Sequence, residues 1–310
     1  MNEQATVIGR LAERYPLLYL NPDRDDLETY RAVVLRGEDP GKRDLSHFTL
    51  DPRDREETFD TPSGPVEVVT QWNRADYETF VRGMMAARKG PLAAVPPTEG
   101  ASTLAVFNWG KIKAHQARFL REEREKGVTD PDWGAEFARF TAEKSNYLDL
   151  LIVLSRGPYS HIDAATAGYG EDEWIALSDT IRKYHELNHV ICRRLYPERI
   201  HAVWDELAAD ATGLYAAFGR FDPGMEKLFL GIRGEKYTGG RLENYTKTPD
   251  EQAEVICEVL EELRDIIGKQ QGTGPFELTL TLVKRAEEEP LRGLIGQLDR
   301  GPSFHGGQPK

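Results

Sequence analysis

The chain has 310 residues, of which 39% are hydrophobic and 30% charged, a composition typical of a globular protein rather than a disordered one. Its 40 Lys and Arg residues against 52 Asp and Glu residues give a formal net charge of −12, so the average surface repels nucleic-acid backbones and anionic membranes. No run approaches the roughly 18 apolar residues needed to span a bilayer. The negative charge and the lack of such a run together lead us to expect neither nucleic acid nor a membrane as partner.

The N-terminus and the two cysteines predict a cytoplasmic protein. The first residues, MNEQATVIGR, lack the basic segment and apolar run of a secretory signal. Cys192 and Cys257 are too few for a disulfide framework, so reduced thiols are expected. The sequence does not predict an oligomeric state.

The N-terminal part of the chain, about residues 1–100, is predicted to be mixed and irregular. Charge and proline in the first sixty residues indicate loops around short elements. Residues 66–72 have strand character, and Asn73 is expected to cap a helix that ends at Lys89 before Gly90. The short apolar run 103–107 predicts a buried strand.

The remainder of the chain is predicted to be mainly helical. Residues 148–154 are apolar without a break and fit either a strand or the buried end of a helix. The alternating run 276–283 (FELTLTLV) predicts a strand, and 301–310 a flexible tail. The predicted helices are 111–126, a second opened by Asp130 as cap with Pro131 first, 171–196, 197–218 with Pro197 ending one helix and starting the next, and 249–267.

These elements predict an α+β fold with a small sheet, organised as one domain over residues 1–300.

The helices at about 171–219 contain the residue pattern that indicates a metal site. His185, Glu186 and His189 form H-E-x-x-H, which on a helix lets both imidazoles reach one metal ion. Glu186 lies about 100° around the helix, beside the ligands, where a general base is needed.

The helical wheel indicates that both histidines face inward. With Trp174 at zero, Ile181, His185, Cys192 and Tyr196 fall within about 40° of it, and His189 lies at the edge of the stripe. Leu177 and Leu195 flank the other edge. Two buried imidazoles at ligand spacing need partners, and a shared metal ion satisfies both.

The following helix offers a third ligand. Glu206 and Asp210 share one face with small residues, which allow a close approach to the first helix. We expect Glu206 to complete the metal site and Asp210 to accept a hydrogen bond from a ligand histidine. The small residues of this face are Ala202, Ala209, Gly213 and Ala217.

The pattern H-E-x-x-H followed by E-x-x-x-D resembles the gluzincin group of zinc metallopeptidases, over about residues 184–213. The resemblance implies a zincin-like fold with an active site between two consecutive helices. It implies that His185, His189 and Glu206 bind Zn²⁺, that Glu186 activates water, and that Asp210 supports a ligand. The gap between His189 and Glu206 is short for the group, and only three candidate strands precede the first metal helix.

The resulting hypothesis is a zinc-dependent hydrolase that cleaves a peptide or a small amide, with Glu186 as general base. The donor that stabilises the transition state stays open among residues near the metal helices in sequence. These candidates are Tyr159, His161, His201, Tyr237, Arg241 and Tyr245.

Three alternatives also stay open. Glu186–His189 and Glu198–His201 each have the E-x-x-H spacing of di-iron carboxylate bundles, which favours another metalloenzyme chemistry. Cys192 could replace Glu206 as a ligand. A catalytically silent, zincin-like binding protein is the third alternative.

Overall fold

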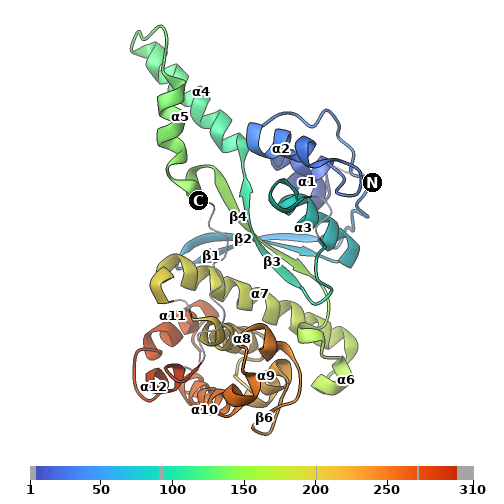
Figure 1. The fold of residues 1–310 in the computed structure, drawn as a ribbon, viewed down its shortest axis with the longest axis vertical. Coiled ribbons are helices and arrows are strands. Elements are labelled where there is room, and N and C mark those ends of the chain that lie inside the picture. Colours follow the sequence, from blue (N-terminus) through green and yellow to red (C-terminus); the bar gives the residue numbers. More distant parts are fainter. Residues whose placement is uncertain (1–4, 91–93, 200, 271, 299–310) are drawn as a thin grey trace. The chain divides into compact units, whose positions relative to one another are not determined.

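The computed structural model describes residues 5–90, 94–199, 201–270 and 272–298. It has an α+β fold that is mainly helical with a small sheet, as predicted (Figure 1). The predicted tail, 301–310, lies outside the described residues. None of the described helices is long and apolar enough to cross a membrane.

The first half of the chain alternates helices with the strands of the main sheet (Figure 1). Its elements are α1 (Val7–Arg14), the 3₁₀ helix η2 (Pro16–Tyr19), α2 (Leu27–Arg36), β1 (Arg55–Thr61), β2 (Gly64–Gln71), α3 (Arg74–Lys89), β3 (Ala101–Phe107), α4 (Trp109–Glu125), α5 (Trp133–Thr141), η3 (Lys144–Asn146) and β4 (Leu148–Ser155).

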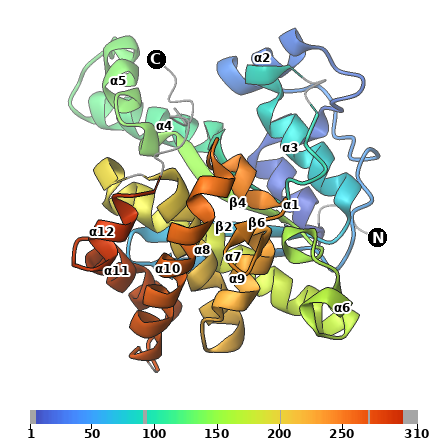
Figure 2. The ribbon, with the colours of Figure 1, turned by 60° about the horizontal axis from the view of Figure 1, so that its bottom comes forward.

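The second half is almost entirely helical (Figure 2). Its elements are η4 (Tyr159–His161), α6 (Ala164–Ala167), α7 (Glu171–Leu195), η5 (Pro197–Arg199), α8 (Ala202–Phe218), α9 (Pro223–Leu230), β5 (Ile232–Arg233), β6 (Lys236–Tyr237), η6 (Arg241–Asn244), α10 (Pro249–Gly268), α11 (Pro275–Arg285) and α12 (Leu291–Ile295).

Residue contacts divide the chain into two compact units. The first comprises Met1–Thr58 and Glu67–Ser155, and the second comprises Phe59–Val66 and Arg156–Lys310. Each has its own hydrophobic core. The organisation as one domain over 1–300 stays a prediction.

The main sheet has the strand order β1-β2-β4-β3 in the described part of the chain. β2 runs parallel to β4, with Val69 opposite Val153, and β3 runs antiparallel to β4, with Leu104 opposite Leu151. The apolar run 148–154 is therefore a strand, and its C-terminal half is buried because it lies inside the sheet. β1 is the strand that the sequence prediction missed, since its residues REETFDT are half-exposed and polar.

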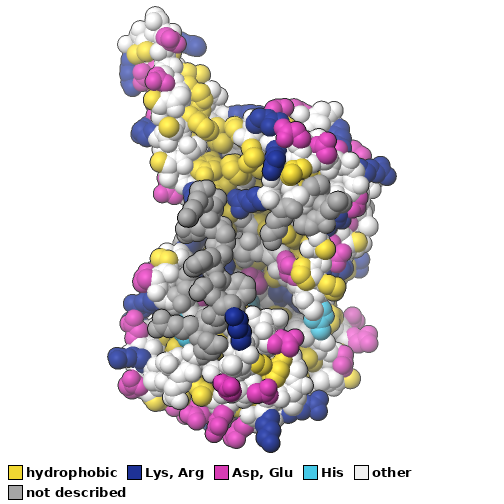
Figure 3. Space-filling view, in the orientation of Figure 1, with side chains coloured by type: hydrophobic (Ala, Val, Ile, Leu, Met, Phe, Trp, Pro, Cys, Tyr) yellow, Lys and Arg dark blue, Asp and Glu magenta, His cyan; other side chains and the backbone are white. Residues whose placement is uncertain are grey.

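The first unit forms its helices where the sequence places capping residues. Asn73 caps α3 by accepting a hydrogen bond from the Ala75 backbone, and Gly90 follows the helix, both as predicted. α4 and α5 form a helical hairpin, and Figure 3 shows hydrophobic side chains on its surface. α5 is capped by Asp132 and not by Asp130, because the Asp132 side chain accepts from Ala135. The predicted cap was wrong by two residues.

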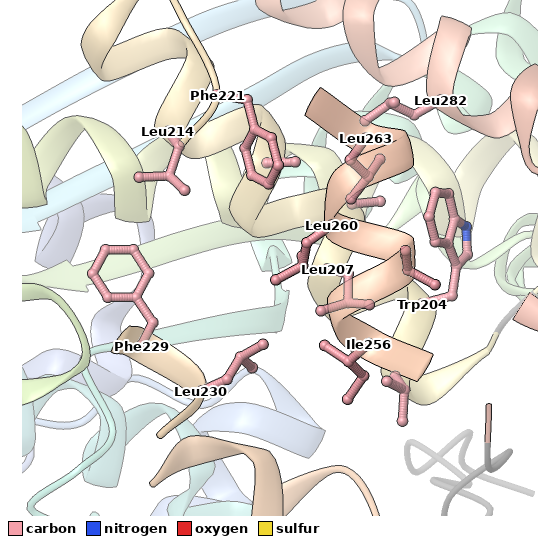
Figure 4. Close-up of a cluster of buried hydrophobic side chains, with 14 of the residues drawn as sticks. Trp204, Leu207, Leu214, Phe221, Phe229, Leu230, Ile256, Leu260, Leu263 and Leu282 are labelled. Atoms are coloured by element: carbon pink, nitrogen blue, oxygen red, sulfur yellow. The ribbon is translucent and has the colours of Figure 1, made fainter. Parts of the chain in front are cut away.

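The core of the second unit is built mainly by α8, α9 and α10. Figure 4 shows Leu207 of α8 together with Ile256 and Leu260 of α10, and α9 contributes Phe229 and Leu230 to the same cluster. α10 begins at Pro249 after Thr248, as predicted, and its apolar residues repeat at helical spacing. α8 packs on this core and also on α7, which contributes Trp174 and Ile181 to it.

The prediction of a strand over 276–283 was wrong, because these residues form α11. Pro275 occupies the first helical turn, Glu277 accepts a hydrogen bond from the Gly274 backbone N–H, and Lys284 and Arg285 lie in the last turn. Leu278 and Leu282, four residues apart, are both buried. Burial of this helical stripe outweighed the β propensity of the alternating threonines and leucines.

The connection between α7 and α8 also differs from the prediction. Pro197 ends α7 but does not start α8, because it opens the short 3₁₀ helix η5. α8 begins at Ala202, and the His201 side chain caps it by accepting from the Trp204 backbone. The side chain of His201 therefore acts as the N-cap of α8.

Glu226 of α9 predicts a pH dependence of stability. Its carboxyl group is fully buried, and neither oxygen has a hydrogen-bond partner within the described structure, so burial raises its pKa well above the ordinary value. Above the ordinary pKa the unfolded chain releases this proton while the folded chain keeps it, so the free energy of unfolding falls as pH rises toward the folded pKa. We expect Glu226→Met to raise the free energy of unfolding at pH 8 by about 1–3 kcal/mol, and by less at pH 5.

Urea unfolding of both proteins at the two pH values measures this effect. Glu258→Met, at an exposed position of α10, is the matched control and should change stability little at either pH. A gain that is the same at pH 5 and pH 8 would show that Glu226 does not titrate as described.

Candidate metal centre

α7 carries the first part of the site. Acidic residues in its first turn and Arg193 and Arg194 in its last turn complement the helix dipole. Trp174, His185 and His189 are at most 6% exposed, which confirms the predicted inward stripe. The stripe does not continue to the end of the helix, where Leu195 is 39% exposed.

α8 approaches α7 closely at Gly213. A Cβ atom at this position would lie 2.5 Å from the backbone carbonyl oxygen of Ile181, so only glycine fits. Asn188 of α7 links α7 to α8, because its Nδ2 atom donates to the Thr212 hydroxyl at 3.0 Å. The same Nδ2 atom donates to the Thr279 hydroxyl of α11 at 3.1 Å. The predicted small-residue contact is confirmed at Gly213.

Three side chains converge across this contact. The Nε2 atoms of His185 and His189 are 3.0 Å apart. Glu206 Oε2 lies 3.4 Å from His185 Nε2, and Glu206 Oε1 lies 3.3 Å from His189 Nε2. Among the described residues, these three form a group of ligating side chains that could hold a metal ion.

The separations fit a tetrahedral ion. Zinc bonds of about 2.0–2.1 Å to nitrogen and oxygen place neighbouring ligand atoms about 3.3–3.4 Å apart. The three observed separations of 3.0, 3.3 and 3.4 Å are close to this edge length. Two imidazoles and one carboxylate are also a donor set that zinc accepts, and they leave a fourth position for water or substrate.

Asp210 orients the first histidine. Its Oδ1 atom accepts a hydrogen bond from His185 Nδ1 at 2.7 Å, and the Asp210 side chain is completely buried. Because an ionised carboxylate only accepts, Nδ1 carries the proton and Nε2 keeps its lone pair for a metal ion. This is the role expected of Asp210 from the sequence.

Arg241 and Tyr159 complete the surroundings of Asp210. Arg241 Nη2 forms an ion pair with Asp210 Oδ2, and Arg241 Nη1 donates to Tyr159 Oη at 2.9 Å. The Tyr159 hydroxyl donates to Asp210 Oδ1 at 2.6 Å. The buried Asp210 carboxylate is therefore compensated by the Arg241 cation and by the Tyr159 hydroxyl, besides His185.

Tyr159 reaches the site from a constrained loop. The Tyr159 backbone donates to Ser178 Oγ, and Arg182 donates to the carbonyl oxygens of Gly157 and Pro158, so α7 holds this loop in place. The next residue, Ser160, has a left-handed backbone with φ +50°. The sequence offered Tyr159 as one of six candidates, and no local pattern distinguished it.

Electrostatics at the site favour an ionised Glu206. Burial raises the pKa of this carboxyl, but the facing imidazoles of His189 and His185 outweigh burial and hold it well below the ordinary value. Tyr245 lies near the same carboxylate. Burial, together with the negative charges of Glu206 and Glu186, raises the pKa of Tyr245 well above its ordinary value, so its hydroxyl stays a proton donor.

Other candidates serve structural roles in the described residues. Tyr237 donates to the Gly240 carbonyl oxygen at 2.9 Å, and His201 caps α8. Cys192 points its Sγ atom at Asn188 Oδ1, 3.6 Å away, and burial raises its pKa to about 12, so it is not placed as a metal ligand. Glu198 and His201 do not join the ligand group, which removes the geometric basis of the di-iron alternative.

Gly213 is expected to control the geometry of the ligand group, because it sets the distance between α7 and α8. Gly213→Ala forces the Ile181 carbonyl and the new methyl group apart, and we expect a loss of about 1–3 kcal/mol in the free energy of unfolding. Chemical denaturation of the parent protein and of Gly213→Ala measures this difference in the free energy of unfolding.

Gly268→Ala is the control for Gly213→Ala, because it adds the same methyl group at the end of α10, where no atom lies within 4 Å. If both substitutions have the same effect, close helix contact at Gly213 does not determine stability.

Comparisons with known proteins place the chain in a family. Neither the curated proteins nor the solved structures include a match. The model of the family described as "Family of unknown function (DUF7005)" matches residues 22–270, a range that contains His185, His189, Glu206 and Asp210. The match covers more than half of the chain, and the protein therefore belongs to the family of unknown function DUF7005.

Proposed function

We propose that this protein is a zinc-dependent hydrolase that cleaves a peptide bond or a related amide bond. The observation that carries the proposal is the triangle of His185 Nε2, His189 Nε2 and Glu206 oxygen atoms, with Glu186 beside it on α7. This donor set has the composition of catalytic rather than structural zinc sites, which normally close with four protein ligands.

His185, His189 and Glu206 would hold the zinc ion, which when bound would lower the pKa of a water molecule to about 7 and polarise a carbonyl oxygen. The protein side chains then supply the proton transfers. In the proposed reaction Glu186 accepts a proton from the attacking water and passes it to the leaving amine. Glu186 is partly exposed, as a residue that meets substrate must be.

Tyr245 is the best supported donor for the developing negative charge on the substrate carbonyl oxygen. It lies near Glu206 and Glu186 and remains protonated because burial and these carboxylates raise its pKa. Arg241 is engaged by Asp210 and Tyr159, so we assign it to positioning. Asp210 keeps His185 in the tautomer that binds metal.

A zincin-like fold is part of the proposal. The resemblance to gluzincins leads us to expect several strands before the first metal helix, and the described strands of the main sheet all precede α7. The motif H-E-x-x-H with E-x-x-x-D brought into contact on successive helices supports the same assignment.

Digestion of a peptide mixture tests the proposal. The zinc-loaded protein is incubated with peptides of varied sequence, and mass spectrometry identifies new termini. We expect cleavage that stops with a chelator and returns with added zinc. If zinc binds but no peptide or simple amide in the mixture is hydrolysed, the proposed activity is wrong.

A further inference from the structure

A cavity of about 290 Å³ in the second unit lies next to the ligand group. His189 forms part of its wall, and the rest comes from α7, η5, α8, α11 and α12. Ligand pockets range upward from roughly 300 Å³, so the volume of this cavity suits one side chain or a small molecule rather than a folded segment. Its contact with His189 places an occupant beside the proposed reaction centre.

The cavity has an apolar wall and a charged rim. Trp204, Ala208 and Leu282 are buried, so the interior is suited to an aliphatic chain. Figure 4 shows the indole nitrogen of Trp204 on the side away from Leu207 and Leu260. The charged residues of the rim are exposed, and they are Arg193, Glu198, Arg199 and Glu287.

Asn188 and Asp205, which both line the cavity, carry oxygens that accept hydrogen bonds. Asn188 uses its amide nitrogen to donate to Thr212 and Thr279, and its Oδ1 atom accepts from the Cys192 thiol at 3.6 Å. Asp205 accepts from the His201 backbone with Oδ2 at 3.0 Å, and its carboxylate has a second oxygen. An occupant therefore needs a hydrogen-bond donor at the end of its apolar chain.

A primary ammonium group meets these requirements best. It carries three donors, is attracted by the Asp205 carboxylate, and interacts favourably with the face of an indole ring such as that of Trp204. On the rim, Arg199 pairs with Glu287 at 3.0 Å, which reduces its repulsion of a cation. Arg193 is exposed, where solvent screens its charge.

We propose that this cavity binds a lysine side chain, or an equivalent primary alkylamine, of the substrate. That the occupant belongs to a substrate rests on the proposed function, whereas binding in the cavity does not. Asp205 and Trp204 would determine specificity without taking part in bond cleavage.

Isothermal titration calorimetry tests binding in the cavity. The probes are hexylamine, 1-hexanol and hexanoate, which share one chain and differ at the end. Ala208→Leu, which fills part of the cavity, is the control and should weaken binding of all three probes. We expect hexylamine to bind about tenfold more tightly than hexanol, because a charged hydrogen bond adds to burial of the chain, and hexanoate to bind least.

Asp205→Asn keeps the acceptor for the His201 backbone but removes the charge, and it should give hexylamine and hexanol equal affinity. Equal affinity for the two probes in the parent protein, or a preference for hexylamine that survives in Asp205→Asn, overturns the ammonium site. Binding of none of the probes, or binding that Ala208→Leu does not weaken, overturns the cavity as a binding site.

Cleavage of paired peptides separates this inference from the proposed function. Peptides with lysine are compared with copies that carry norleucine, which has the same chain without the ammonium group. Faster cleavage of the lysine peptides supports both proposals, and cleavage without preference rejects only the lysine pocket. Selective binding of hexylamine without cleavage of any peptide keeps the ammonium site and rejects the hydrolase.

Discussion

Replacement of Glu186 by glutamine is expected to lower kcat/KM for peptide hydrolysis by about 10²–10⁴-fold, the usual contribution of a general base. The amide cannot accept the proton of the attacking water, but it has nearly the same size and does not belong to the ligand group. Zinc content should therefore remain at about one ion per chain. Steady-state kinetics and elemental analysis of the same preparations measure both quantities.

Glu173→Gln is the matched control for Glu186→Gln. Glu173 is exposed on the same helix, α7, and belongs neither to the ligand group nor to the cavity lining, so its substitution should leave both activity and zinc content unchanged. Loss of metal in Glu186→Gln would make this residue a ligand rather than a base. If Glu186→Gln hydrolyses peptides as fast as the parent protein, a different residue is the base. If neither protein hydrolyses peptides and the substitution changes no other measured function, a binding protein is favoured.

Replacement of His185 by alanine is expected to remove the bound zinc. His185 Nε2 contributes two of the three edges of the ligand triangle, and Asp210 and Tyr159 lose the imidazole that they contact. Elemental analysis should detect about one zinc per chain in the parent and none in the variant. Zinc at 100 times its dissociation constant should stabilise the parent by about 2.7 kcal/mol and the variant hardly at all, which thermal unfolding with and without zinc measures.

His115→Ala provides the corresponding control. His115 also contacts a carboxylate, with Nε2 2.5 Å from Glu136 Oε1, but it belongs to α4 in the first unit. This substitution should leave zinc content and the zinc-dependent stabilisation unchanged. Zinc retained by His185→Ala, or iron found in place of zinc in the parent, would reject the proposed site.

The sequence by itself determined the candidate ligands that lie close together in the chain. His185 and His189 share a face because residues four apart on a helix are neighbours, and this geometry needs no tertiary information. The same holds for Glu206 and Asp210 on α8. Caps such as Asn73 were also predictable, because a side chain that bonds to its own helix is encoded within a few residues.

Only the tertiary structure decided which distant residues join the site. Tyr159 follows β4 and Arg241 follows β6, and both side chains contact Asp210. Local periodicity carries no information about contacts between residues so far apart in the chain. It also decided that residues 276–283 are helical, since burial of Leu278 and Leu282 outweighed their β propensity. Local patterns specify a face and a cap, whereas long-range burial selects among conformations of similar local energy and brings the remaining side chains together.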